Sequence, residues 1–175
     1  MSRKSVGSDV TNYTYDLFGS LRSVVLPNGL SIEYVTDPTN RRVGKKVNRV
    51  LQRGFLYQDA LRPVAELNGS NQVISRFVYA TGRNVPDYML RGGQTYRFIT
   101  DHLGSPRLIV NASTGAVVQR LTYDTWGKVI SDSSPGFQPF GFAGGLYDPE
   151  TGLVRFGARD YDPSIGRWTA KDPVS

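Results

Sequence analysis

The chain has no cysteine and a single histidine among its 175 residues. The absence of cysteine excludes disulfide bonds, thiolate catalysis and cysteine-ligated zinc. One histidine cannot form a histidine-rich metal site, and nothing around His102 suggests a Ser/His/Asp triad. We therefore interpret His102 as a turn residue, and we expect neither a metal nor another cofactor.

Long apolar runs are missing as well. Residues 1–9 are basic but lack the apolar stretch of a signal peptide. No run approaches the roughly 18 apolar residues that a membrane span requires. These absences predict a chain that has no membrane span, is made in the cytoplasm, and leaves the cell, if at all, with a partner or through a dedicated delivery machine.

Helix signals are weak, whereas strand and turn residues are abundant. The chain has 19 glycines and 10 tyrosines. Tyrosine favours half-buried strands, and glycine favours tight reversals. The best helix candidate, residues 44–56, is rich in β-branched residues that alternate, which favours a strand instead. Composition therefore predicts many short strands with frequent turns.

A repeat runs through most of the chain. An acidic turn follows an aromatic-led strand at Asp16, Asp37, Asp59, Asp101 and Asp124, with Ala80 in the missing slot. These slots lie about 21 to 23 residues apart, which is the length of a β-hairpin with its two reversals. The pair Asn28-Gly29 predicts a two-residue type I′ turn between two of the strands.

Six basic residues are concentrated in one stretch of a chain whose net charge is +6. They are Arg41, Arg42, Lys45, Lys46, Arg49 and Arg53. Such a stretch can bind phosphate backbones, although it is more often a solvated strand face or a surface that meets an acidic partner. Phe55 and Tyr57 alternate as in a strand rather than as in an RNA-stacking motif, so a nucleic-acid partner is the less favoured interpretation.

The last eighty residues carry an ordered set of motifs. It comprises Tyr96–Arg107 with Asp101-His102-Leu103-Gly104, then Leu121–Gly127, Gly141–Gly144, Asp148–Leu153 and Arg159–Pro173. In this order and spacing the set resembles the core domain of RHS-repeat (YD-repeat) proteins, which include the C components of Tc toxins and the teneurins. We expect residues 1–95 to form hairpin repeats and residues 96–175 to form the core domain, with the chain ending near the motif at which that family cleaves itself.

The resemblance implies an all-β fold of antiparallel hairpins that spirals into a shell, with the core curling inward as an end-plug. The implied function is structural: a closing segment of a cocoon that encapsulates a C-terminal toxin or other cargo in a bacterial polymorphic-toxin system. The implied partners are the rest of an RHS shell or another RHS subunit, and the cargo. The unpaired edges of an open ribbon also predict self-association.

The resemblance further implies an aspartate-dependent self-cleavage, which gives the first alternative function, an autopeptidase. Its candidate residues are Asp162 and Asp172, with Arg159 or Arg167 as the polarising cation. Two carboxylates held close can share a proton, so that one acts as base or nucleophile and the other as acid. Because Asp-Pro pairs also start ordinary turns, both residues could equally be turn residues. The second alternative is a basic binding module for nucleic acid or an acidic partner.

The aromatic side chains near the C-terminus could be interpreted as a surface on which a ligand stacks. Aromatic residues at strand spacing usually form core or cross-strand pairs rather than a ligand-stacking surface. We therefore expect most of these rings to be buried. They are Trp126, Phe140, Phe142, Phe156 and Trp168.

Overall fold

A computed structural model describes residues 2–170 of the chain. These residues form strands and one short 3-10 helix, η1 (Phe142–Gly144). No helix in this part of the chain is long and apolar enough to cross a membrane. The structure confirms the predicted all-β class.

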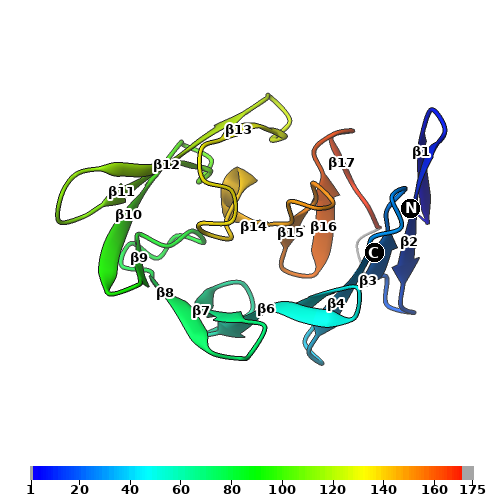
Figure 1. Ribbon diagram of the computed structural model, residues 1–175, viewed down its shortest axis with the longest axis horizontal. Helices are drawn as coiled ribbons and strands as arrows, with labels where there is room; N and C mark the ends of the chain where they lie inside the picture. The colour runs from blue at the N-terminus through cyan, green and yellow to red at the C-terminus, as the bar shows by residue number, and fades with distance from the viewer. Residues whose placement is uncertain (1, 171–175) are drawn as a thin grey trace.

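Thirteen strands form one antiparallel sheet in which each strand pairs with its neighbours in sequence. This curved sheet bends around on itself and stays open between its first and last strands (Figure 1). The strands are β1 (Arg3–Val6), β2 (Asp9–Tyr15), β3 (Leu21–Val25), β4 (Ser31–Thr36), β5 (Arg42–Val47), β6 (Val50–Tyr57), β7 (Pro63–Asn68), β8 (Val73–Val78), β9 (Tyr88–Arg91), β10 (Gln94–Thr100), β11 (Pro106–Asn111), β12 (Val117–Tyr123) and β13 (Val129–Asp132).

Residues 134–170, the inner segment, lie within the curve of this sheet (Figure 1). They carry η1 and a second antiparallel sheet of four short strands. These are β14 (Leu146–Tyr147), β15 (Val154–Phe156), β16 (Arg159–Asp162) and β17 (Arg167–Trp168). The predicted domain boundary at residue 95 falls inside β10, and the division into repeats and core at that point stays a prediction.

Aspartate side chains build most of the turns at one end of the hairpins. At Asp101, Oδ1 accepts the backbone N–H groups of Leu103 and Ser105 at 3.0 and 2.9 Å, while Gly104 has a positive φ of 91°. The turns at Asp16, Asp37 and Asp124 repeat this pattern. In the slot of Ala80, the carboxylate of Asp87 accepts the N–H groups of residues 80 and 81 instead.

At three places along the curved sheet, tyrosine and arginine side chains link neighbouring hairpins. The hydroxyl of Tyr79 donates to the carbonyl of Pro63 at 2.8 Å, and Arg62 lies over the Tyr79 ring at 5.8 Å. The same pair of contacts joins Tyr57 to Arg41 and Arg42, and Tyr123 to Pro106 and Arg107. The repeat seen in the sequence is therefore a repeat of specific inter-hairpin contacts.

Two predicted local features have different outcomes. The stretch 44–56 is strand, as predicted, but it is divided between β5 and β6 by Asn48 and Arg49, which both have positive φ. That two-residue turn has the type I′ form. The type I′ prediction at Asn28-Gly29 is wrong, because only Gly29 has positive φ and its N–H bonds back to the Leu26 carbonyl in a three-residue loop.

Candidate functional site

The inner segment is seated against the concave side of the curved sheet, and this contact surface is the candidate site. Close approach of its own strands depends on glycine. A Cβ atom on Gly145 would lie 2.5 Å from Cγ1 of Val154, and one on Gly141 would lie 2.8 Å from Cβ of Tyr147. These glycines let the chain fold back on itself in a space that larger residues would fill.

Apolar rings fix the first half of the inner segment. Phe140 is buried and meets the ring of Phe77 edge-on at 4.9 Å and that of Phe98 at 5.9 Å. Phe55 and Met89 of the curved sheet belong to the same core cluster. Edge-to-face aromatic contacts add to the free energy gained from burial, so Phe140 anchors this half.

Buried ion pairs fix the second half. Asp160 accepts from Arg42 of β5 at 2.9 Å on one carboxylate oxygen and from Arg155 at 2.8 Å on the other. The Arg155 guanidinium also donates to the side-chain and backbone oxygens of Asn40 at 2.9 Å. Arg42 additionally lies 3.5 Å from the centre of the Tyr34 ring. Charges this deeply buried persist only when paired and hydrogen-bonded.

A second group of charges lies beside the first. Nζ of Lys45 is 2.7 Å from Oδ1 of Asp148 and also contacts the carboxylate of Glu150, while the Tyr34 hydroxyl donates to Oδ2 of Asp148. Burial favours a higher pKa for Asp148, but the charge of Lys45 and the hydrogen bonds outweigh it and lower that pKa. Asp148 is therefore held as a carboxylate that fastens the inner segment to β4 and β5.

The first strand, β1, meets β16 of the inner segment through Lys4 and Asp162. Nζ of Lys4 lies 2.6 Å from Oδ2 of Asp162, whose other oxygen accepts from the backbone and hydroxyl of Ser164. Nearby, the Tyr15 hydroxyl lies 3.5 Å from the carbonyl of Thr169. The end of the inner segment therefore returns to the strands at which the curved sheet begins.

Several cations of the basic stretch pair with carboxylates of the same chain. Arg42 and Lys45 point to the carboxylates of the inner segment, and Arg53 pairs with buried Glu66 at 2.8 Å. Sequence reasoning missed these pairings. The available signal was the concentration of carboxylates late in the chain, at positions 148, 150, 160 and 162. A nucleic-acid partner, the less favoured interpretation of this stretch, stays untested.

Three of the four predicted cleavage residues lie among the described residues. Asp172 lies outside the described residues. Asp162 is buried with 3% of its surface exposed, and its ion-pair partner among residues 2–170 is Lys4. Arg159 lies 4.3 Å from the centre of the Trp168 ring, and the backbone of Arg167 pairs with that of Asp162 in β17 and β16. Whether the two carboxylates converge stays a prediction.

The late aromatic residues divide between core and surface. Phe140 is in the core, as expected, but Trp126 and Trp168 have 61% and 43% of their surface exposed. Phe156, Tyr161 and Trp168 contact one another edge-on, with ring centres 5.7 to 6.5 Å apart. Phe142 and Phe156 are half-buried, so the expectation that most of these rings are buried is wrong. Trp168 instead forms a cross-strand pair with Tyr161. His102 occupies the turn after Asp101, as predicted.

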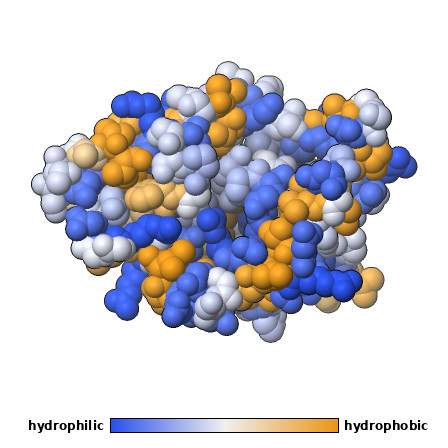
Figure 2. Space-filling view, viewed as in Figure 1, coloured by the Kyte–Doolittle hydropathy of each residue, from blue (hydrophilic) through white to orange (hydrophobic). Residues whose placement is uncertain are grey.

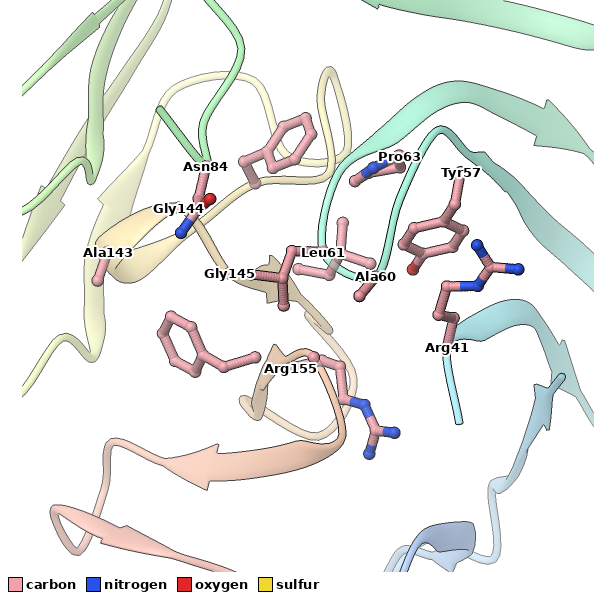
Figure 3. A pocket seen from close by; sticks show the side chains of 14 residues that line it. Arg41, Tyr57, Ala60, Leu61, Pro63, Asn84, Ala143, Gly144, Gly145 and Arg155 are labelled. Atoms are coloured by element: carbon pink, nitrogen blue, oxygen red, sulfur yellow. The ribbon is translucent and has the colours of Figure 1, made fainter. Parts of the chain in front are cut away.

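A pocket of about 190 Å³ lies where the turn after β6 meets the inner segment. Figure 3 shows its lining, with the guanidinium groups of Arg41 and Arg155 at one end and Ala143 and Gly144 at the other. Arg41 is bound to Asp37, and Arg155 is bound to Asp160. Both cations are thus paired with carboxylates of the protein itself. Residues 2–170 contain no group of three or more acidic or histidine side chains placed to hold a metal ion.

Hydrophobic and hydrophilic side chains alternate in small patches over the face of the molecule shown in Figure 2. The buried ion pairs lie instead where the inner segment meets the curved sheet. These buried ion pairs hold the inner segment and the curved sheet together.

Comparisons with known proteins agree with this architecture. The family model described as Teneurin YD-shell matches residues 2–174. Teneurin-4 of Mus musculus is 34% identical over 171 residues, which is 95% of this chain and 6% of that protein. Teneurin-m of Drosophila melanogaster is 40% identical over 76 residues, which is 43% of this chain and 3% of that protein.

Solved structures show the same fold. The crystal structure of TcdB2-TccC3 superposes with a TM-score of 0.67 at 20% identity, covering 94% of this chain and 9% of that chain. The Photorhabdus luminescens Tc holotoxin pore with the TccC3-D651A mutation gives a TM-score of 0.65 at 18% identity, again over 94% of this chain and 9% of that chain. The present chain thus spans a small part of each relative.

Proposed function

The chain belongs to the Teneurin YD-shell family, and from this premise we propose that it is the closing segment of a hollow β-shell. The curved sheet is a stretch of the shell wall. The inner segment is the plug that fills the opening which the wall leaves. The longer relatives contain the remaining wall, because this chain covers 6% of mouse Teneurin-4 and 9% of the TcdB2-TccC3 chain.

One observation carries the proposal: the wall supplies buried cations and the inner segment supplies the carboxylates that neutralise them. Arg42 and Lys45 are separated by more than a hundred residues from Asp160 and Asp148. Unpaired, these cations would be costly to keep inside the curve. The wall is thus built to receive this particular segment, as a structural role in closure requires.

Hydrogen exchange followed by mass spectrometry tests the plug directly. We expect amides of residues 146–162 to be protected to the same degree as those of β4 to β6. Lys45→Met should lower protection at residues 146–152, because the carboxylate of Asp148 loses its cation while the sheet remains. Lys46→Met is the matched control and should leave the protection unchanged. An unprotected inner segment in a folded wild-type sheet would exclude the closing role.

Enclosure of a polypeptide cargo is the further part of this proposal. A wall with a self-supplied plug separates an inside from an outside, and the similarity to RHS-repeat proteins supports a toxin or other cargo inside. In a chain extended by further shell repeats and a cargo segment, the cargo should resist added protease until the plug contacts are broken by Lys45→Met. Cleavage of the cargo at the same rate before and after the substitution would argue against enclosure.

Self-processing at Asp162 and Asp172 is our second proposal, and the burial of Asp162 supports it. A buried carboxylate beside a cation is a common arrangement in sites that move protons. In a chain extended past Ser175 by a cargo segment, mass spectrometry should show cleavage of the wild type. Either Asp162→Asn or Asp172→Asn should leave the chain intact. Cleavage by the double variant would show that these aspartates are turn residues only.

A further inference from the structure

The pocket of about 190 Å³ beside the turn after β6 is lined by both parts of the chain. The curved sheet contributes Tyr57 and Leu61, together with Asn84 from the segment between β8 and β9. The inner segment contributes Gly144 of η1 and Arg155 of β15, and Figure 3 shows these residues gathered around the pocket. A molecule held here would contact the curved sheet and the inner segment at once.

Most of the lining is apolar or small. Phe140 and Phe156 supply aromatic rings, and Leu61 and Pro63 supply aliphatic groups. Glycine keeps the space open, since a Cβ atom on Gly157 would come within 2.9 Å of the Leu61 side chain. An apolar cavity of about 150 Å³ is enough to bind benzene. This pocket therefore has room for one ring or one branched alkyl group with a small polar head.

One polar atom of the lining has no partner among residues 2–170. Arg155 is 3% exposed, and its two terminal nitrogens donate to Asp160 at 2.8 Å and to Asn40 at 2.9 Å. Its third donor, Nε–H, is buried and has no hydrogen-bond acceptor among these residues. Buried donors in folded proteins are nearly always hydrogen-bonded. This N–H group is therefore suited to an acceptor that a ligand brings.

The charge around Arg155 is also unbalanced. Arg42 and Arg155 share the single carboxylate of Asp160. Burial lowers the pKa of both guanidinium groups and Asp160 raises it, and the balance is upward for Arg42 but downward for Arg155, beside which Arg42 lies. The excess negative charge of the neighbouring group lies on Glu150, which is bound to Lys45 and is 35% exposed. A ligand with one negative charge would therefore compensate Arg155.

We propose that this pocket binds a small carboxylic acid with a compact apolar body, either an aromatic ring or a branched alkyl group. The ligand carboxylate accepts the Nε–H of Arg155, and hydrogen bonds between a guanidinium and a carboxylate are among the strong ones in proteins. The apolar body lies against Phe140 and Phe156. The guanidinium of Arg41 lies at the same end of the pocket as that of Arg155 (Figure 3). This inference goes beyond the closing role, because it needs only the observed contact between the inner segment and the curved sheet.

Other small ligands fit the pocket less well. A phosphate ester brings three acceptor oxygens and up to two negative charges. Among the described residues, only Arg155 brings an unpartnered buried side-chain donor to this lining. A neutral apolar molecule would fill the volume but would leave that donor without an acceptor. One charge and one compact apolar group are the combination that matches both observations.

Nuclear magnetic resonance tests the site directly, because the Nε–H groups of arginine give signals of their own. Sodium benzoate is the probe, added to the isotope-labelled chain at constant ionic strength. We expect the Nε–H signal of Arg155, identified by its loss in Arg155→Lys, to shift and saturate with a Kd on the order of 1 mM or tighter. Benzyl alcohol keeps the ring without the charge, and acetate keeps the charge without the ring. Each should bind at least tenfold more weakly than benzoate.

A pair of matched variants separates binding from folding. Ala60 lines the pocket and is exposed in the turn between β6 and β7, so Ala60→Phe should fill the opening and weaken benzoate binding at least tenfold. Ala112 is exposed in the turn between β11 and β12, away from the pocket lining. Ala112→Phe is therefore the control and should bind benzoate as the wild type does. Arg155→Lys keeps a positive charge but lacks Nε–H, and it should also lose at least tenfold in affinity.

Four outcomes would overturn the proposal. They are an Arg155 signal that does not move, equal affinity for benzoate and benzyl alcohol, binding that Ala60→Phe leaves unchanged, and an equal shift with sodium chloride, which would mean a site for small inorganic anions only. Failure of the closing role is distinguishable from all four, because it appears as an unprotected inner segment in hydrogen exchange without any added ligand.

Discussion

Asp160 is the residue on which the most buried charge depends. Its two oxygens each hold one guanidinium, from Arg42 and Arg155, and all three side chains are almost fully buried. Asp160→Asn would leave two buried cations without their anion. We expect the free energy of unfolding, measured by urea denaturation, to fall by about 3 to 5 kcal/mol.

An exposed pair provides the control for this loss. Arg22 lies 3.2 Å from Asp16, and its side chain is 44% exposed. Removing the pair with Arg22→Gln should change the free energy of unfolding by less than about 1 kcal/mol, because solvent already screens both charges. Equal losses from the two substitutions would mean that the Asp160 cluster is hydrated rather than buried.

Gly29 isolates the effect of backbone conformation. Its φ is 83°, and a Cβ atom at this position would meet nothing within 4 Å. Gly29→Val should therefore destabilise the protein through strain in the left-handed region alone, by about 1 to 2 kcal/mol in thermal or urea unfolding. Asn71→Gly, at a residue with φ of 60°, is the opposite exchange and should be neutral or slightly stabilising.

At the scale of one element, the aspartate turn behaves as a unit. Oδ1 of Asp101 accepts two backbone N–H groups that otherwise have no partner within the turn. Asp101→Ala should lower the free energy of unfolding by about 1 to 3 kcal/mol, since it removes two hydrogen bonds to a charged acceptor. Asp101→Asn keeps the acceptor oxygen and should retain most of the stability, as Asn68 does naturally in its own turn. Indistinguishable Ala and Asn variants would contradict this account.

Much of each hairpin could be predicted from local sequence. Leu30 to Tyr34 alternates as a strand that is buried on one side, and Ile32 and Tyr34 are indeed buried in β4. Aspartate followed by glycine three residues later encodes the turn, because the side chain bonds the backbone and glycine accepts positive φ. The Asn28-Gly29 prediction failed because Pro27 joins the loop, which then has three residues instead of two.

Long-range pairings could not be predicted in the same way. Nothing near Arg42 or Lys45 distinguishes them from Lys46, which neighbours them in the same basic stretch. The difference arises only once the chain returns through the curve and places Asp148 and Asp160 opposite β5. Local patterns determine which face of a strand a residue occupies, but a partner a hundred residues away is determined by the assembled fold.

At the scale of the whole molecule, acid should weaken the seat of the inner segment. The pKa of Asp148 is lowered on folding, so its contribution to stability is present above about pH 4 and is lost as the pH falls through the lower folded value. Asp37 behaves alike, with a pKa lowered from 3.8 to about 2. We expect urea unfolding to show a loss of stability between about pH 4 and pH 2.

Glu66 acts in the opposite direction and must be separated from this effect. Burial outweighs the cations Arg53 and Arg91 and raises its pKa, so protonation of Glu66 on acidification favours the folded state. Comparing the wild type with the Asp148→Asn variant cancels the contribution of Glu66, because both proteins contain that residue. The stability difference between wild type and variant should be largest at pH 7 and should shrink below pH 4. A difference that is independent of pH would show that Asp148 is not charged in its seat.

The ion pairs between the curved sheet and the inner segment also have a consequence for synthesis of the chain. Lys45 and Asp148 are 103 residues apart, so a ribosome that adds roughly 5 to 20 residues per second delivers the carboxylate about 5 to 20 s after the lysine. During that interval the nascent chain presents cations that have no anion to meet. Any polyanion near the ribosome could occupy them transiently, and only completion of the inner segment ends the competition.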